Sequence, residues 1–357
     1  MSDKKEKSQK KGRRSGRGGI FATVVLVILI LITFATATVV FLVQRRILSE
    51  SETQETAKEY GRYYAFISDD DDSSFWKEVY DGAKVAGDEA DAYVEDFAAD
   101  LAVTYSTEER IKVAVAAGVD GIIVENVGRA SVKNEIAAAA EAGIPVVLAG
   151  SGDDDAETGR ISFVGVSRYD LGGMYGRQVA VLAKKLLNDK DRVRITVLTG
   201  RDSDAESQKL LISAIREILS QDTDLYGKID FETYEIDDIG TFASQRSVTD
   251  MLMDPSNVPD ILVTLNEDHT NSAYQAVIDN NIVGRCNIIG YYDSEAIRDA
   301  IKNEIIYSTV SVDAFQMGRY AADALSEYLD TGYVSEYYTA DSYAVDHSTV
   351  VGEGGEP

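Results

Sequence analysis

The chain has 357 residues, room for two or three domains of the usual ~100–200 residues, and its 45% hydrophobic and 27% charged content excludes wholesale disorder. With 35 basic and 61 acidic residues the formal net charge is −26, which argues against nucleic acid as a partner because such a surface repels phosphates. The one cysteine, Cys286, excludes a disulfide framework and a four-cysteine zinc site, and only two histidines, His269 and His347, are available for histidine-based catalysis.

The first 61 residues predict a membrane anchor. Residues 1–19 hold eight basic and two acidic side chains, so a net charge of +6 precedes a remainder of −32. Residues 20–43 contain no charge, glycine or proline, and as a helix they would span ~36 Å, enough for a hydrocarbon core of ~30 Å. We expect 1–19 to be a basic cytoplasmic tail, 20–43 a single transmembrane signal anchor, and 44–61 a polar stalk outside the cell membrane.

A cleaved signal peptide is the alternative for this segment. Ala35-Thr36-Ala37 forms a small-x-small cleavage pattern after an apolar run. The apolar run continues to Val43, however, and this favours the uncleaved anchor.

From Arg62 onward the sequence alternates between strand and helix patterns. Strands are predicted at Tyr63–Ser68, Asp91–Phe97, Gly121–Asn126, Pro145–Ala149, Ile161–Val166, Val193–Thr199, Ile229–Ile236, Asp260–Leu265, Asn287–Tyr292 and Ile305–Val310. Helices are predicted between most of them, including Phe75–Ala86, Ser131–Ala142, Leu171–Leu187, Ala205–Leu219, Ser272–Asn280 and Phe315–Leu329. Strands that are apolar on both faces are typical of parallel sheets covered by helices, and this many units favours two doubly wound α/β lobes.

Ligands of such sheets bind beyond the carboxyl ends of the strands, so the residues there are the candidates for a site. They combine hydrogen-bonding side chains with two adjacent aromatic rings and contain no evident nucleophile–base pair: Asp72, Ser73, Phe75, Trp76, Glu125, Ser151, Arg168, Asn266, Tyr292, Asp293 and Asp313. Aromatic rings stack on the C–H face of a sugar while amides and carboxylates bind its hydroxyls, so a polyhydroxyl ligand is favoured.

Structural roles remain open for several of these residues. Ser73 can simply cap the helix that follows it, and Phe75 and Trp76 can belong to the core. The acidic run Asp69–Asp72 is typical of a solvated turn. No metal is assigned, and the loop at residues 188–192 carries arginine where calcium would need oxygen ligands.

Seven segments in chain order resemble the type I periplasmic solute-binding proteins of the ribose/galactose-binding class. They are FISDDDDSSFWKEVYDGAK, AGVDGIIVEN, AGIPVVLAGS, FVGVSRYDLGGMYG, ILVTLNEDHTNSAYQAV, IIGYYDSEAIRDAI and STVSVDAFQMGRYAADAL. The resemblance covers roughly residues 62–350. Lac-repressor-type regulators share this domain behind a DNA-binding segment, but here a predicted membrane span precedes it, which argues against transcriptional repression.

The resemblance implies two lobes that close on a ligand and are joined by three crossing strands. We expect the crossings near residues 167–169, 312–313 and 339–341. The first lobe would then comprise residues 62–167 and 313–338, and the second lobe residues 168–312 and 339–350. Residues 351–357 are expected to form a disordered tail.

The family's binding residues carry over only in part. Phe75 and Trp76 match its stacking aromatics, Asn266 matches its hydroxyl-binding asparagine, and Ser73 falls near a polar contact. Elsewhere the sequence differs from the family pattern. Gly150-Ser151 stands in place of Asp-Arg, and Ser207, beside Glu206, stands in place of an arginine. Tyr292 occupies the position of the usual aspartate, with Asp293 one residue later, and Val312 before Asp313 occupies that of a glutamine. The arginine clamp is therefore missing, and Arg168 is its one candidate substitute.

Together these features predict an extracellular, membrane-anchored receptor for a carbohydrate or similar small polar ligand, without enzymatic activity or cofactor. It would serve an ABC permease or a sensor kinase. Two alternatives remain: an interaction module of the same fold with a degenerate cleft, and an enzyme using paired carboxylates such as Asp72 and Asp293.

Overall fold

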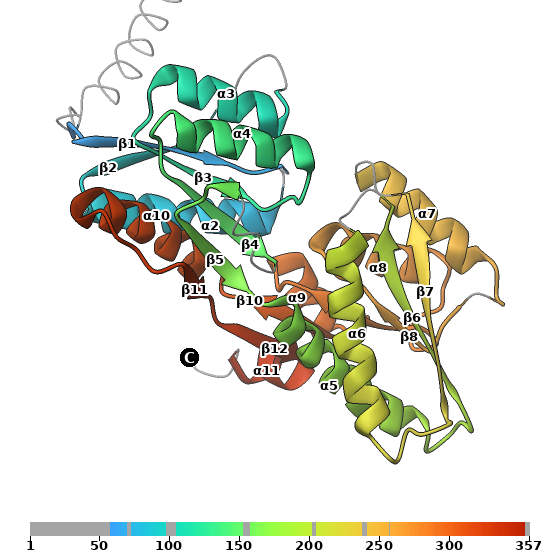
Figure 1. Cartoon of the computed structure of the whole chain (residues 1–357). Helices are drawn as coiled ribbons and strands as arrows, with labels where there is room; N and C mark the ends of the chain where they lie inside the picture. Colours follow the sequence, from blue (N-terminus) through green and yellow to red (C-terminus); the bar gives the residue numbers. More distant parts are fainter. Residues whose placement is uncertain are drawn as a thin grey trace, which may run out of the picture. The chain divides into compact units, whose positions relative to one another are not determined.

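The computed structural model describes residues 58–69, 73–97, 105–152, 158–201, 205–237, 241–256 and 258–353. The predicted cytoplasmic tail, the predicted membrane span at 20–43 and most of the predicted stalk lie outside these residues. Within the described part of the chain, no helix has the length and apolar character needed to cross a membrane. All its helices and strands belong to one compact unit that starts at Tyr60 (Figure 1).

The first sheet has six strands in the order β11-β5-β4-β3-β1-β2, and all of its pairs are parallel. The strands are β1 (Arg62–Ile67), β2 (Ala92–Asp96), β3 (Gly121–Glu125), β4 (Val146–Ser151), β5 (Ser162–Val166) and β11 (Tyr337–Thr339). Helices α2 (Ser74–Glu89) and α10 (Ala314–Thr331) cover one face, and α3 (Thr107–Ala117) and α4 (Ala130–Glu141) cover the other (Figure 1). The prediction of strands apolar on both faces is confirmed, since a hydrophobic core lies on each side.

The second sheet repeats this plan with the order β12-β10-β9-β8-β6-β7. Its strands are β6 (Val193–Gly200), β7 (Ile229–Ile236), β8 (Ile261–Val263), β9 (Asn287–Tyr291), β10 (Ile306–Val312) and β12 (Ser342–Asp346). Helices α5 (Arg168–Leu186) and α6 (Ala205–Gln221) pack on one face. Helices α7 (Thr241–Met253), α8 (Glu267–Asp279), α9 (Glu295–Lys302) and α11 (His347–Glu353) lie on the other.

The ten predicted strands are all present, and their observed ends lie within two residues of the expected ones. The expectation of purely parallel sheets is wrong for one pair, because β12 runs antiparallel to β10. β10 ends where the chain leaves the second lobe and β12 begins where it returns, so Val312 pairs with Ser342 and the two strands run in opposite directions.

Helix α8 begins five residues before its predicted start at Ser272. Asn266 caps it, because its side-chain oxygen accepts a hydrogen bond from the backbone N–H of His269 at 2.7 Å. Glu267 and Asp268 then occupy the first turn, where the helix dipole favours negative charge. His269, one of the two histidines of the chain, is buried in this helix.

The chain passes between the two sheets three times. β5 ends at Val166 before α5 packs on the second sheet, β10 ends at Val312 before α10 packs on the first, and β11 ends at Thr339 before β12 joins the second. Thr339 pairs within the first sheet, so that lobe extends one residue beyond the expected boundary. Helix α11 reaches Glu353, so the first three residues of the expected disordered tail are helical.

Helices α2 and α10 touch backbone to backbone through two glycines. A Cβ atom on Gly82 would lie 2.0 Å from the carbonyl oxygen of Phe315, and one on Gly318 would lie 1.8 Å from that of Val79. No side chain fits at either position without moving a helix. This close contact fixes α2, whose first turn carries Phe75 and Trp76.

Candidate functional site

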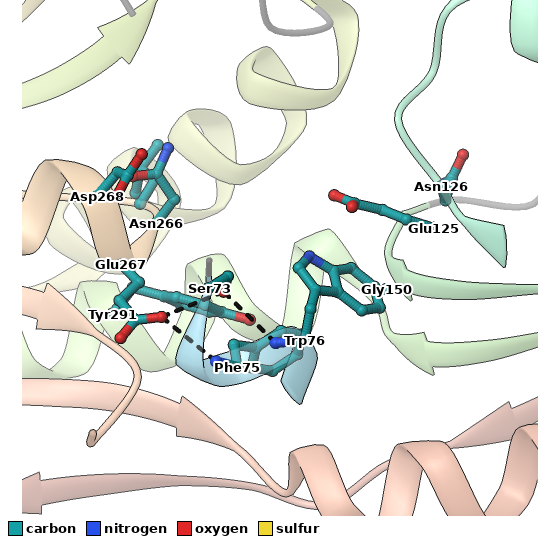
Figure 2. A pocket seen from close by; sticks show the side chains of 11 residues that line it. Ser73, Phe75, Trp76, Glu125, Asn126, Gly150, Asn266, Glu267, Asp268 and Tyr291 are labelled. Carbon is teal, nitrogen blue, oxygen red and sulfur yellow. Dashed lines mark hydrogen bonds between the residues drawn. The ribbon is translucent and has the colours of Figure 1, made fainter. Parts of the chain in front are cut away.

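A cavity of about 240 Å³ opens between the two lobes, at the carboxyl ends of strands from both sheets (Figure 2). The first lobe supplies two aromatic rings, a carboxylate, an amide and small residues: Ser73, Phe75, Trp76, Glu125, Asn126 and Gly150. The second lobe supplies a second amide, two carboxylates, an apolar side chain and a tyrosine: Leu265, Asn266, Glu267, Asp268 and Tyr291.

The N-terminus of α2 places both aromatic rings. Ser73 is the N-cap, and its hydroxyl accepts a hydrogen bond from the backbone N–H of Trp76 at 3.4 Å. Phe75 and Trp76 lie in the first turn, with ring centroids 5.2 Å apart in an edge-to-face arrangement. Trp76 is 9% exposed, so it belongs to the core and also lines the pocket. The capping and core interpretations of these residues are therefore confirmed, and they coexist with a place in the cavity.

Side chains of the second lobe meet α2 directly. A carboxylate oxygen of Glu267 accepts hydrogen bonds from the hydroxyl of Ser73 at 3.2 Å and from the backbone N–H of Phe75 at 3.3 Å (Figure 2). An anion at a helix N-terminus is favourable because the N–H groups there lack helical partners. The hydroxyl of Tyr292 donates to the carboxylate of Glu78, also on α2. The lobes thus touch at one side of the cavity.

The floor of the pocket depends on a glycine. Gly150 has a φ of +131°, a conformation that residues with a side chain rarely adopt, and a Cβ there would lie 3.6 Å from the ring of Trp76. A side chain at this position would crowd the benzene edge of the indole. The glycine, which stands where the family pattern has a polar residue, avoids this contact.

Negative charge surrounds the cavity. Glu125 lies across it from Asn266 and Asp268 (Figure 2), and its carboxylate accepts a hydrogen bond from the backbone N–H of Asp69 at 2.7 Å. Burial raises the pKa of Tyr291, and the charges of Glu267 and Glu125 raise it further. Both carboxylates therefore act on a tyrosine that lines the pocket.

Asp69, whose backbone N–H binds Glu125, is itself held in place by Arg129 and Thr107. Two nitrogens of Arg129 donate to its two oxygens, at 2.9 and 2.6 Å, and the hydroxyl of Thr107 donates as well. Burial acts to raise the pKa of Asp69, but the hydrogen bonds from Arg129 and Thr107 outweigh it and leave the pKa below its ordinary value. The pair fixes the backbone that positions Glu125.

A sequence profile described as "Periplasmic binding protein domain" matches residues 64–333. The chain belongs to this family. Periplasmic binding proteins bind solutes and are not enzymes, so the prediction of a non-enzymatic protein is confirmed. No curated protein matches the sequence.

Solved structures show the same two-lobed fold. A glucose-galactose binding protein, GanP of Geobacillus stearothermophilus, is similar with a TM-score of 0.68 at 20% identity, over 80% of this chain and 98% of its own. The XylFII–LytSN complex matches with a TM-score of 0.65 at 20% identity, over 81% and 98%. An ABC transporter solute-binding protein of Agrobacterium vitis bound with α-D-tagatopyranose matches with a TM-score of 0.69 at 13% identity, over 81% and 96%. These likenesses establish the fold.

Five of the twelve residues expected in the site of this periplasmic binding protein line the cavity: Ser73, Phe75, Trp76, Glu125 and Asn266. That they bind a ligand stays a prediction. Asp72 lies outside the described residues, as do the side chains of Ser151 and Glu206.

Two neighbouring expected residues are engaged elsewhere. Asp293 accepts hydrogen bonds from Arg298 at 2.8 Å, from Ser311 and from Tyr343, and it does not line the cavity. Tyr292 has a φ of +67°, which turns its side chain away from the cavity and toward Glu78.

The other two residues that the structure places outside the lining stand at the lobe crossings. Asp313 caps α10 by accepting the backbone N–H of Gln316 at 2.8 Å. Arg168 is the first residue of α5. The arginine expected as a substitute clamp is therefore absent from the lining residues that the structure describes.

Sequence reasoning missed six lining residues: Asn126, Gly150, Leu265, Glu267, Asp268 and Tyr291. Five of them directly adjoin an expected residue along the chain, and Asp268 lies two residues from Asn266. The strand ends were therefore the right signal, but they did not show which neighbour faces inward. For metal chemistry, the described residues contain no cluster of three or more His, Cys, Asp or Glu side chains that is placed to hold an ion.

Proposed function

We propose that this protein is an extracytoplasmic receptor that binds one sugar, or a similarly small hydroxylated molecule, in the pocket between its lobes. The observation that carries the proposal is the pairing of an aromatic platform, Phe75 and Trp76, with amide and hydroxyl groups in one interlobe cavity. An aromatic face packs on the C–H face of a sugar ring, while the side-chain amides of Asn126 and Asn266 are suited to donate and accept hydrogen bonds at its hydroxyls. The hydroxyl of Ser73 already donates to Glu267, so it offers a ligand only its second lone pair.

The size of the cavity supports a single-ring ligand. Its volume of about 240 Å³ lies below the ~300–1,000 Å³ typical of pockets for drug-sized molecules. The cavity lies where the lobes approach each other, so closure of the hinge would bury a ligand between them. Structural relatives are consistent with this, since their names describe glucose-galactose, D-arabinose, D-allose and tagatopyranose binding.

The proposal includes a tether to the cell membrane. The apolar residues 20–43 behind a basic segment supply the support, and they place the binding unit outside the cell. Fractionation of cells and the intact mass of the product test this part. A soluble product that begins at Thr38 would show that the segment is a cleaved signal peptide.

Downstream, the occupied receptor would deliver its ligand to an ABC permease or report it to a sensor kinase. Solute-binding proteins of ABC transporters stand among the structural relatives, and so does XylFII in complex with LytSN. Either partner would recognise the lobes in the arrangement that the ligand stabilises.

One observation favours a second candidate, an interaction module with a degenerate cleft. Glu267 and Tyr292 join the lobes through the protein's own side chains, and the arginine clamp usual in the family is missing from the described lining. Such a module would need no ligand to hold its lobes together.

Thermal unfolding of the full-length chain in detergent, with and without sugars, separates the two functions. A ligand at 100 times its dissociation constant stabilises the native state by ~2.7 kcal/mol, which corresponds to a melting temperature higher by about 5 °C or more. The receptor predicts such a shift with at least one monosaccharide. Absence of a shift with every member of a broad set of sugars, nucleosides and amino acids would favour the interaction module.

A further inference from the structure

The described lining of the cavity between the lobes is negatively charged. Three of its lining side chains are carboxylates, Glu125, Glu267 and Asp268, whereas none of its described lining residues is lysine or arginine. Two of the carboxylates are held in place by donors of the protein: Glu125 by the backbone N–H of Asp69, and Glu267 by Ser73 and the N–H of Phe75. They come from both lobes, so a ligand between the lobes would meet negative charge on two sides.

Nearby arginines are directed to other acids. Arg129 forms its bidentate contact with Asp69, and Arg298 donates to Asp293 at 2.8 Å. Neither lines the cavity. Arg129 and Arg298 therefore neutralise carboxylates outside the cavity.

The aromatic rings of the cavity suit a cationic ligand as well as a neutral one. Phe75, Trp76 and Tyr291 line the same cavity, and Phe75 stands 5.2 Å from Trp76 and 5.9 Å from Tyr291 between ring centroids. The face of an aromatic ring attracts a cation within ~6 Å of its centroid, and tryptophan does so most strongly. Rings that stack on a sugar also favour a positive charge attached to it.

We propose that the pocket selects ring-sized ligands that carry a protonated amine beside their hydroxyls, namely amino sugars or aminocyclitols, over the corresponding neutral sugars, and that it excludes sugar acids. The selection rests on the proposed receptor function and deepens it. An ammonium group donates charge-assisted hydrogen bonds to Glu267 and Asp268, and these are about twice as strong as neutral ones. A uronate carboxylate would instead approach three like charges without a cation to receive it.

The test measures the affinity of matched pairs for the full-length chain in detergent, at a pH of about 6.5, where an amine with an ordinary pKa of ~8 is protonated. The pairs are D-glucosamine with D-glucose and D-galactosamine with D-galactose, and D-glucuronate and N-acetyl-D-glucosamine serve as charge controls. Trp76 is the only tryptophan, so its fluorescence reports directly on the cavity. We expect the amine of at least one pair to bind about tenfold or more tightly than its neutral partner. That ratio should shrink as salt rises from about 0.05 to about 0.5 M.

Glu267→Gln provides the sharper experiment, with Glu295→Gln as its matched control. Both glutamates are the first residue of a helix in the second lobe, α8 and α9, but only Glu267 lines the cavity. We expect E267Q to reduce the amine-to-neutral affinity ratio about tenfold, and E295Q to leave the ratio unchanged. Asp268→Asn tests the same point independently should E267Q fail to fold.

The outcomes separate this inference from the function on which it rests. The charge selection is overturned if a neutral sugar binds as tightly as its amine. It is also overturned if E267Q and D268N leave the amine-to-neutral affinity ratio unchanged. In both cases the proposed receptor function is retained. Tight binding of glucuronate likewise overturns the charge selection and leaves the receptor function in place. If neither member of any pair binds, and no other sugar shifts the melting temperature, both proposals fail.

Discussion

Trp76→Leu tests whether the indole is part of a binding platform or only part of the core. The side chain is 9% exposed and lines the cavity. A buried tryptophan covers up to ~250 Å², so ~20 Å² remains for a ligand to bury, worth ~0.5 kcal/mol at ~25 cal/mol per Å². The lost ring contact adds ~0.5–1.5 kcal/mol. We therefore expect the dissociation constant of a bound sugar to rise about 5- to 30-fold.

The same substitution also destabilises the fold, because the ring of Trp76 packs on Phe75 and Phe66. The loss should stay below the ~3–5 kcal/mol typical of truncating a buried Phe or Trp to alanine. Phe66→Leu is the matched control: Phe66 is 2% exposed, its ring centroid lies 6.3 Å from that of Trp76, and it does not line the cavity.

Isothermal titration calorimetry measures affinity in both variants, and urea denaturation measures their stability. We expect both variants to be less stable and only W76L to lose affinity, with F66L within about twofold of the wild type. If F66L lost as much affinity as W76L, the indole would act through packing alone. Unchanged affinity in W76L would remove the ring from the site.

Two further predictions concern the frame around the pocket. Gly318→Ala should lower the free energy of unfolding by ~1–3 kcal/mol or more, because its methyl group would lie 1.8 Å from the carbonyl oxygen of Val79. Gly173→Ala on helix α5, where the nearest atom to a Cβ is the end of the Arg177 side chain at 3.4 Å, should instead be neutral or stabilise by up to ~1 kcal/mol. Equal urea midpoints for the two variants would contradict the packing argument. Asp69→Asn should make the stability of the protein less sensitive to acid. Because Arg129 holds the folded-state pKa of Asp69 low, this carboxylate contributes stability above its unfolded pKa of ~3.9, and the contribution is lost as the pH falls through the lowered value. Melting temperatures between about pH 5 and 3 should therefore fall less in D69N than in the wild type, and parallel curves would refute the role of the pair.

Much of the fold is readable from the sequence because the central strands are apolar runs buried on both faces, whereas the edge strand β7 is largely exposed. Runs such as Gly121–Glu125 and Ile261–Val263 have no polar face, and only a helix-covered parallel sheet accommodates that pattern. The edge strand β12 escapes prediction because its partner and direction depend on where the chain returns from the other lobe.

The site is predictable to the level of the strand end and no further. Side chains alternate between faces along a strand, so at the end of β9 one tyrosine faces the cavity and its neighbour does not. The positive φ of Tyr292 sends that ring to Glu78 and leaves Tyr291 in the pocket. Likewise, Asn266 and Asp313 both cap helices, but only Asn266 lines the cavity, and sequence cannot distinguish the two.

The most direct test of the account is a fluorescence titration of the full-length chain with a set of monosaccharides and their amino derivatives. Because the chain has a single tryptophan and this residue lines the interlobe cavity, its emission should change saturably with one ligand per chain. The same ligand should raise the melting temperature. Two results would contradict the claim that the pocket between the lobes is the binding site. In one, no compound of the set changes the emission of Trp76. In the other, a ligand stabilises the protein without changing that emission.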